Sequence, residues 1–201
     1  MKLKQIEIIC FLSLFICIVI STLNFDNQCE DIRGNILRLH VIANSDSKKD
    51  QALKYEVRDT LLKEGSFAVS DSKTKQQATK SISDSLDFLR KKAQQKVYDK
   101  GFGYDVKVEV AKSYFPTRQY EDITLPAGYY DAVKVIIGEG KGKNWWCVMF
   151  PCLCLPAATK GSVCPEDILD EKQLEIIKDK NRYEVRFWLV EKYYEIFKNK
   201  A

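Results

Sequence analysis

Alternating apolar and polar side chains predict four strands in this chain. They are expected at residues 36–43, 104–110, 129–137 and 145–150, where β-branched and aromatic residues recur with period two. In the first of them Leu39 and Val41 share an apolar face, and Arg38 and His40 lie on the opposite, polar face. The glycine-rich run 138–143 predicts a tight turn that joins the last two strands as a hairpin.

Apolar residues at helical spacing predict three helices. The first follows the capping cluster at residues 44–47 and ends near Gly65 after about four turns. The second is a longer amphipathic helix that ends at Gly101, and the third spans residues 182–198. In the third helix Val185, Trp188, Leu189, Tyr193 and Ile196 are expected to face the core. Further apolar residues widen this arc, which leaves an interface open as an alternative to core packing.

The order of these elements lacks a regular strand–helix–strand alternation. It therefore predicts a single α+β domain at residues 27–201, with a mostly antiparallel sheet covered on one side by helices.

Before this domain lies a segment with the pattern of an export signal. Lys2 and Lys4 precede an uncharged apolar run from Ile8 to Ile20, which extends with little interruption to Phe25. Residues 1–26 are therefore predicted to be a signal peptide or a signal anchor, with membrane anchoring through residues 8–25 as the second alternative. The lysines orient the N-terminus inward, so the domain is expected to be extracytoplasmic.

Composition excludes several classes of function. The net charge of +4 arises from 32 basic and 28 acidic residues, a surplus too small to indicate nucleic acid as a partner. With His40 as the single histidine, the common catalytic triads and multi-histidine metal sites are hard to build. We therefore predict no catalytic residue, no metal and no cofactor.

Five cysteines lie in the predicted exported part, namely Cys29, Cys147, Cys152, Cys154 and Cys164. The intervals within the cluster 147–164 do not match a zinc ribbon, so a local disulfide is favoured over a metal site. Cys147 and Cys154 are candidates to close a small loop that stiffens this region.

Two motifs invite chemical interpretations that fail on their spacing or context. The run 138–144 lacks the glycine and hydroxyl positions of a phosphate loop and is followed by a strand-like segment instead of a helix. Asp46 and Asp50 lie at a predicted helix start, where capping explains carboxylates. His40 with Ser45 or Asp46 remains an alternative, weakly supported site for an exported hydrolase.

The densest specific feature is the segment from Asn144 to Pro151. Trp145 and Trp146 are adjacent on a strand and point to opposite faces, so one can enter the core while the other meets a partner. Aromatic residues of this kind dominate interaction hot spots. We predict a rigid contact surface formed by Trp145, Trp146 and Phe150 together with the turn Asn44-Ser45-Asp46.

These same segments resemble a known family. Residues 37–47, 50–54, 57–59, 125–130 and 137–151, in this order, are similar to the stage II sporulation protein R family of endospore-forming bacteria. The helix Glu184 to Lys192 also resembles its closing segment. Cys152 stands where the family usually has a second proline, and the family pattern favours pairing of Cys147 with Cys154.

The resemblance implies a signalling protein that is made in the forespore and exported to the space between forespore and mother cell. There it would activate a membrane-embedded aspartic protease of the mother-cell septal membrane, stage II sporulation protein GA, which processes pro-sigma-E. The rival hypotheses are the exported hydrolase and an envelope-bound scaffold whose N-terminal segment stays uncleaved.

Overall fold

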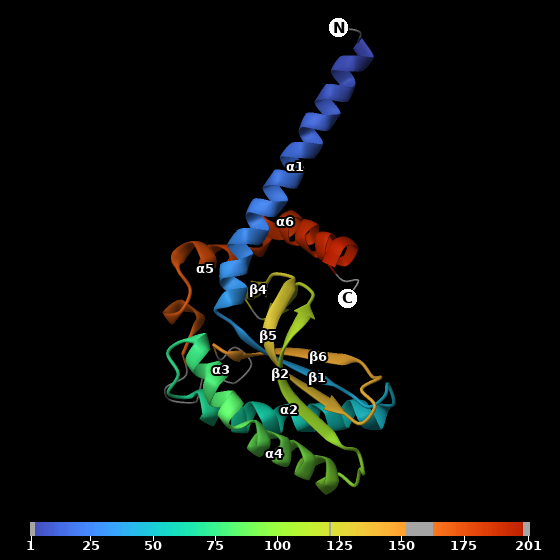
Figure 1. The fold of residues 1–201 in the computed structure, drawn as a ribbon, viewed down its shortest axis with the longest axis vertical. Coiled ribbons are helices and arrows are strands. Elements are labelled where there is room, and N and C mark those ends of the chain that lie inside the picture. Colours follow the sequence, from blue (N-terminus) through green and yellow to red (C-terminus); the bar gives the residue numbers. More distant parts are fainter. Residues whose placement is uncertain (1–2, 121, 152–162, 199–201) are drawn as a thin grey trace.

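The computed structural model of the chain describes residues 3–120, 122–151 and 163–198 (Figure 1). Its helices are α1 (Leu3–Gly34), α2 (Lys48–Val69), α3 (Lys75–Asp84), α4 (Leu86–Asp99), α5 (Glu171–Lys178) and α6 (Lys180–Tyr193). Its strands are β1 (Leu37–Ile42), β2 (Val106–Phe115), β3 (Arg118–Tyr120), β4 (Ile123–Leu125), β5 (Gly128–Ile137) and β6 (Asn144–Phe150). A short 3₁₀ turn, Pro165–Asp167, precedes α5, and a π-helical turn, Tyr194–Lys198, follows α6.

A four-stranded sheet in the order β2-β5-β1-β6 forms the centre of the fold. β1 runs parallel to β5 and antiparallel to β6, and β2 runs antiparallel to β5. The predicted α+β class with a mostly antiparallel sheet is therefore confirmed. The predicted hairpin is wrong, because β1 lies between β5 and β6. The glycine-rich connection between β5 and β6 instead passes the end of β1. β1 lies between these two strands because its apolar residues are buried most completely in a central position of the sheet.

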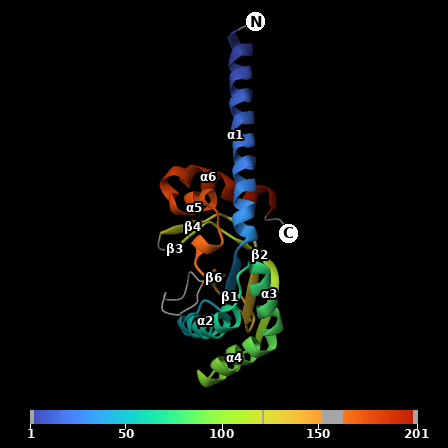
Figure 2. The same ribbon diagram turned by 90° about the vertical axis from the view of Figure 1, so that its left-hand side faces the viewer.

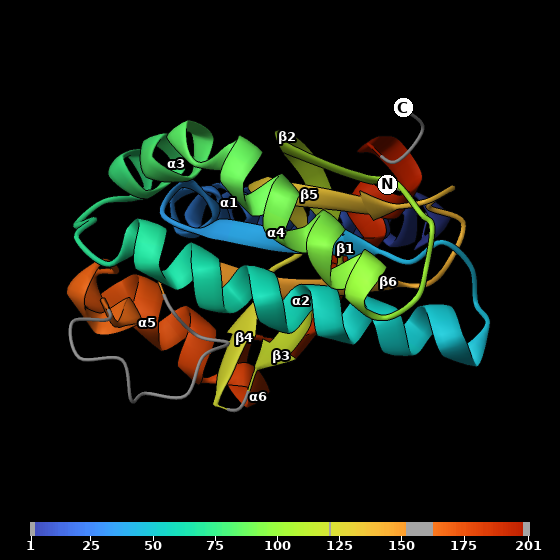
Figure 3. The same cartoon turned by 90° about the horizontal axis from the view of Figure 1, so that it is seen from below.

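Both faces of this sheet are covered, whereas the sequence predicted helices on one face. α2, α3 and α4 pack on one face around Leu39 and Val41, as the view from below shows (Figure 3). The end of α1, the β3–β4 ribbon, α5 and α6 cover the other face (Figure 2). The predicted polar face of β1 is consequently buried, and Arg38 and His40 lie inside the protein.

The helices differ from their predicted bounds for local reasons. α2 continues past Gly65 to Val69. Gly65 serves close packing and not a helix end, because a side chain at this position would meet the methyl group of Met149. The predicted long helix is broken at Ser85 into α3 and α4. Ser85 belongs to a run of short polar residues that favour caps over helix interiors. The N-terminus of α3 is capped by Thr74, whose side chain accepts a hydrogen bond from Gln77 N.

α1 crosses the predicted domain boundary at residue 26 without interruption. Its apolar N-terminal part is exposed, and from Phe25 onward its inner face is buried against α5 and α6 through Cys29 and Ile32. α1 is long and apolar enough to cross a membrane, as either a signal sequence or an anchor would be.

The closing helix buries a different stripe from the one the sequence predicted. Tyr183, Phe187, Val190 and Tyr194 face the core, whereas Val185 and Trp188 are exposed. The apolar residues of α6 surround the helix, so helical periodicity alone did not identify the buried side.

Candidate functional site

A groove of about 440 Å³ opens beside β6, the last strand of the central sheet. Its walls come from three separate parts of the sequence, namely α2, the β3 strand and the start of β6. The lining residues are Gln51, Lys54, Tyr55, Arg118, Gln119, Tyr120, Lys143, Asn144, Trp145 and Trp146. We call this feature the aromatic groove.

The two adjacent tryptophans flank the edge strand, one on each face of the sheet. The Trp145 ring meets Tyr55 edge-on, with centroids 5.2 Å apart, and the Arg58 guanidinium lies 4.5 Å from its centre. The Trp146 ring stacks on His40 at 6.1 Å and receives the Arg118 guanidinium at 4.4 Å. The predicted opposite orientation of the two rings is thus present, and both rings are half-buried.

Cationic side chains give the aromatic groove a positive character. The Lys54 ammonium donates hydrogen bonds to Gln51 Oε1 (2.6 Å) and to the Lys143 carbonyl (3.0 Å). Burial lowers the pKa of Lys54. The nearby Asp46 carboxylate raises this pKa, and the positive charges of Lys143 and Arg58 lower it further. An acidic or aromatic segment is the kind of partner that such a surface complements.

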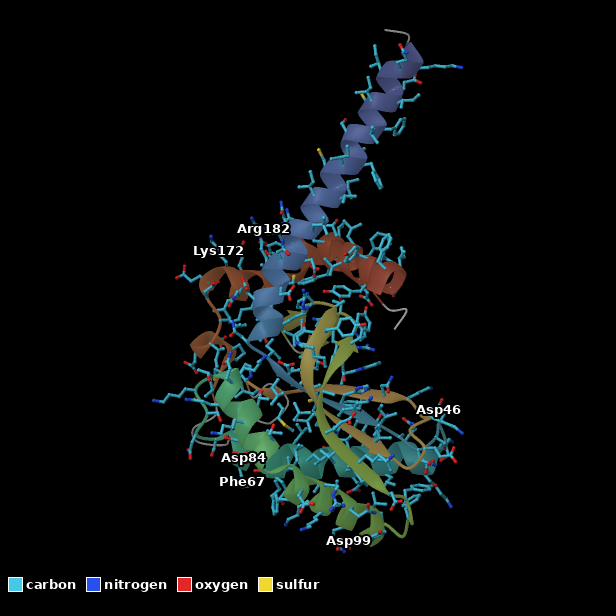
Figure 4. All side chains as sticks on the ribbon, viewed as in Figure 1. Asp46, Phe67, Asp84, Asp99, Lys172 and Arg182 are labelled. Carbon is cyan, nitrogen blue, oxygen red and sulfur yellow. The ribbon has the colours of Figure 1, made fainter. Side chains whose placement is uncertain are left out.

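The turn Asn44-Ser45-Asp46 is organised around the buried carboxylate of Asp50. Asn44 Nδ2 and Ser45 Oγ donate hydrogen bonds to Asp50 Oδ2 at 2.9 and 2.5 Å. Burial by itself raises the pKa of Asp50, but the hydrogen bonds from Ser45 and Asn44 outweigh it and lower the pKa. Asp46 is exposed at the edge of the body (Figure 4) and accepts a hydrogen bond from the backbone N–H of Lys143 at 2.7 Å.

The glycine-rich connection between β5 and β6 packs directly on this turn. Gly138 has φ of +58°, and a Cβ atom there would lie 2.3 Å from the amide oxygen of Asn44. The same oxygen accepts a hydrogen bond from the backbone N–H of Glu139 at 3.0 Å. At Gly142 an added Cβ would lie 2.3 Å from the carbonyl oxygen of Ser45. The glycines are therefore required for close packing of two segments that are far apart in the sequence.

Arg38 supports the aromatic groove from inside the protein. Its side chain is fully buried, with the guanidinium 4.0 Å from the ring centre of Phe115 and 4.8 Å from that of Tyr130. It donates a hydrogen bond to the Tyr120 hydroxyl, which in turn donates to the Trp146 carbonyl at 3.2 Å. Burial lowers the pKa of Arg38. This chain of contacts holds β3 against β6.

The structure brings together most of the residues predicted as a contact surface. Trp145 and Trp146 line the aromatic groove, and Asp46 lies nearby through its contact with Lys143. Phe150, however, is only 1% exposed and has no accessible surface for direct contact. Asn44 and Ser45 are half-buried and engaged in the hydrogen bonds above.

Sequence reasoning did not identify Lys54, Tyr55, Arg118 or Tyr120 as members of this site. They come from α2 and from β3, a short strand that lies outside the four strands predicted from the sequence. The aromatic residues near Arg118 were the one signal that could have indicated the strand.

Cys147 is buried and forms a disulfide. Its expected partner Cys154 lies outside the described residues, so that pairing stays a prediction. Cys29 is buried in α1, and burial raises the pKa of its thiol to about 12, which makes it unreactive as a nucleophile.

The groups of the hydrolase alternative are directed elsewhere. His40 Nε2 is 3.1 Å from Asn144 Oδ1, and the Ser45 hydroxyl donates to Asp50. Among the described residues, no group of three or more His, Cys, Asp and Glu side chains is placed to hold a metal ion.

Burial of the single histidine predicts a specific pH dependence of stability. Burial, with Lys134 and Arg38 nearby, lowers the pKa of His40 below its ordinary value of 6.5 despite the Asn144 hydrogen bond. Below pH 6.5 the unfolded chain therefore binds a proton that the folded chain does not, and stability decreases as the pH falls. We expect a decrease of up to about 1.4 kcal/mol per pH unit in this window.

The measurement is chemical unfolding of the full chain between pH 7 and pH 5, compared with His40→Gln. The variant keeps a donor for Asn144 and contains no imidazole, so its stability should fall less over this range. Equal slopes for the two proteins would contradict the inferred shift.

Comparison with known proteins identifies the family. The family model for stage II sporulation protein R matches residues 33–160, which is more than half of the chain. The chain belongs to the stage II sporulation protein R family. It is 36% identical over 141 residues to stage II sporulation protein R of Bacillus subtilis (strain 168), an alignment that covers 70% of this chain and 63% of that protein. No solved structure matches the chain.

Membership in the stage II sporulation protein R family supports a role in sporulation. The matched residues include the whole central sheet, the turn at Asp46 and the aromatic groove. α5 and α6 lie beyond the matched residues.

Proposed function

We propose that this protein is an exported signalling protein of sporulation that activates a membrane-embedded aspartic protease, stage II sporulation protein GA. It would act without enzymatic activity, in the space between forespore and mother cell. Docking to the outward-facing part of the protease would favour its active state and so promote processing of pro-sigma-E. Activation of this kind requires only a higher affinity for the active state than for the inactive one.

The observation that carries this proposal is the aromatic groove. It combines two tryptophans, two tyrosines and several cations on one accessible surface, which is the composition of interaction hot spots. The indole N–H groups of Trp145 and Trp146 have no hydrogen-bond partner among the described residues. Buried donors of this kind favour a rearrangement in which a partner supplies acceptors.

Family membership and the apolar part of α1 support the proposed site of action outside the forespore cytoplasm. An N-terminal basic and apolar segment is required for export, whether it is later cleaved or retained. The body then folds on the far side of the membrane, where a disulfide at Cys147 is stable.

The test is co-expression of this chain, the protease and the sigma-factor precursor in a host that does not sporulate. We expect processing only when the chain is exported. Trp146→Ala and charge reversal by Asp46→Lys should abolish processing while the chain remains folded. Phe88→Ala is a matched control, because Phe88 is an exposed aromatic residue on α4, and it should leave processing intact.

His40→Gln separates activation by docking from the hydrolase alternative. Processing that persists in His40→Gln supports docking, since no imidazole is then present in the chain. Loss of processing with unchanged binding to the protease would favour the hydrolase. Normal processing by both Trp146→Ala and Asp46→Lys would contradict the aromatic groove as the contact surface.

A further inference from the structure

The outer face of α6 is apolar although it faces away from the core. Val185 is 69% exposed and Trp188 is 56% exposed, and Ile196 in the following π turn is 57% exposed. In the helical projection these residues lie opposite the buried stripe of Tyr183 and Phe187. An apolar face of this size on a secreted domain indicates a surface that is covered in the working protein.

α6 lies where the apolar part of α1 meets the body. The Phe25 ring of α1 stacks on Tyr183 at 5.6 Å and contacts Phe187 at 5.4 Å, and the Arg186 guanidinium lies over it. Figures 1 and 2 show α6 beside α1, at the end of the body from which α1 projects. The face of α6 opposite its buried stripe is therefore turned away from the body and from Phe25, and it is exposed at the end of the body from which α1 projects.

The length of the projecting part agrees with a membrane span that ends at α6. Residues 8–25 of a continuous helix extend for about 27 Å, close to the roughly 30 Å hydrocarbon core of a bilayer. Their large side chains are exposed, for example Phe11. If Phe25 marks the outer end of the span, α6 lies at the level of the lipid headgroups.

We propose that α1 is retained as an anchor and that α6 is an interfacial helix, which lies on the outer surface of the membrane that α1 spans. Trp188 and Val185 would enter the boundary between headgroups and acyl chains, the region in which tryptophan is enriched. The body would then be held in one orientation against the bilayer, instead of moving freely on a tether.

In this proposal α6 binds the membrane through apolar contacts and not through its charge. Residues 171–198 contain seven basic and six acidic side chains. Arg182 is paired with Glu175, and Lys192 with Glu195. A zwitterionic membrane should therefore suffice. The anchor keeps α6 beside the lipid at high effective concentration, so a few inserted side chains are enough.

Brominated lipids provide the direct test with the full chain. The chain has three tryptophans, so replacing Trp145 and Trp146 by Phe leaves Trp188 as the sole tryptophan, whose emission is excited selectively over that of the tyrosines. In phosphatidylcholine vesicles brominated high on the acyl chains, we expect most of the Trp188 emission to be lost, together with a blue shift. The matched control carries its sole tryptophan at position 67, because Phe67 is 65% exposed at the opposite end of the body (Figure 4). Its emission should not change.

A second measurement is limited proteolysis, with the unmodified chain as the reference. Trypsin should cut vesicle-bound protein at Arg182 and Arg186 several-fold faster in the double variant Val185→Glu, Trp188→Glu than in the unmodified chain. Phe67→Glu should leave the rate unchanged.

Unquenched Trp188 emission in brominated vesicles would overturn the proposal. Trp188 that is shielded from an aqueous quencher but unaffected by brominated lipid would also overturn it, in favour of a protein partner or a second copy of this chain. Equal trypsin rates in the double variant and the unmodified chain would overturn it independently.

Discussion

Asp26→Ala is expected to destabilise the protein by about 3–5 kcal/mol, a large fraction of the stability of a domain of this size. Asp26 and Arg33 form a buried ion pair within α1, with Arg33 Nη2 2.8 Å from Asp26 Oδ1. Burial lowers the pKa of Arg33, but the Asp26 carboxylate, with Tyr194 and Tyr130, outweighs it and raises the pKa overall. Removal of the carboxylate leaves the buried guanidinium with only the exposed Glu30 carboxylate, 3.8 Å away, as a counter-charge.

The consequence extends beyond the pair, because Arg33 joins α1 to the body. Its Nη1 atom donates a hydrogen bond to the Ala127 carbonyl at 3.1 Å. A Cβ at Gly128 would lie 2.7 Å from the Arg33 side chain, so the guanidinium lies directly over this glycine. Loss of Asp26 should therefore loosen the attachment of the body to α1.

The measurement is denaturant unfolding of the full chain in detergent. Asp87→Ala is the matched control, since Asp87 pairs with Arg90 at the same 2.8 Å on the exposed face of α4. Exposed pairs contribute about 0–1 kcal/mol. The double variant Asp26→Ala, Arg33→Met should recover part of the loss, because no unpaired charge remains buried. A cost for Asp26→Ala no larger than that for Asp87→Ala would contradict burial of this pair.

Arg38→Ala is expected to cost a similar 3–5 kcal/mol, for a different reason. No carboxylate pairs with Arg38 among the described residues, and its charge is stabilised by the faces of Phe115, Tyr120 and Tyr130. Cation–π contacts of desolvated guanidinium groups contribute about 2 kcal/mol or more, and truncation also leaves a cavity between β1 and β3. Since Arg38 positions Tyr120, the variant should also weaken the docking that we propose at the aromatic groove.

Two further variants separate these contributions in the same unfolding experiment. Arg38→Met keeps most of the packing and removes the charge, so its cost reports the cation–π contacts together with the hydrogen bonds of the guanidinium. Arg118→Ala removes a cation–π contact of similar distance, 4.4 Å from Trp146, from an exposed position. It should cost less than about 1 kcal/mol. If Arg38→Ala lowered the free energy of unfolding no more than Arg118→Ala does, the contacts of Arg38 with the three aromatic rings would not stabilise the fold as we infer.

Local patterns predicted the elements but not their partners. The strands at residues 36–43 and 129–137 were correctly expected, because β-branched residues alternate there. Their parallel pairing was not expected, since period-two alternation is the same for either neighbour. The hairpin was inferred from a short glycine-rich turn, and the pairing of β1 with both β5 and β6 decided otherwise.

The burial of several charged residues was a second feature that could not be predicted from the sequence. Arg38, Asp50 and Lys54 are charged side chains of the kind usually left in water, yet each is nearly fully buried. Asp50 accepts hydrogen bonds from Asn44 and Ser45 in the turn just before its helix. Arg38 and Lys54 are stabilised by groups distant in the sequence, namely Phe115 for Arg38 and the Lys143 carbonyl for Lys54. A pattern within one element cannot report such partners.

The sequence by itself determined the α+β class, the basic and apolar N-terminal segment, the opposite orientations of Trp145 and Trp146, and the family. These depend on periodicity, on composition and on residues close together in the chain. Only the tertiary structure decided that β1 is central, that Arg38 is enclosed by aromatic rings, that α2 and β3 complete the aromatic groove, and that α6 packs beside α1 with an apolar face left exposed. These features arise from packing between distant segments, where the free energy of burial selects one arrangement among several that local patterns allow equally.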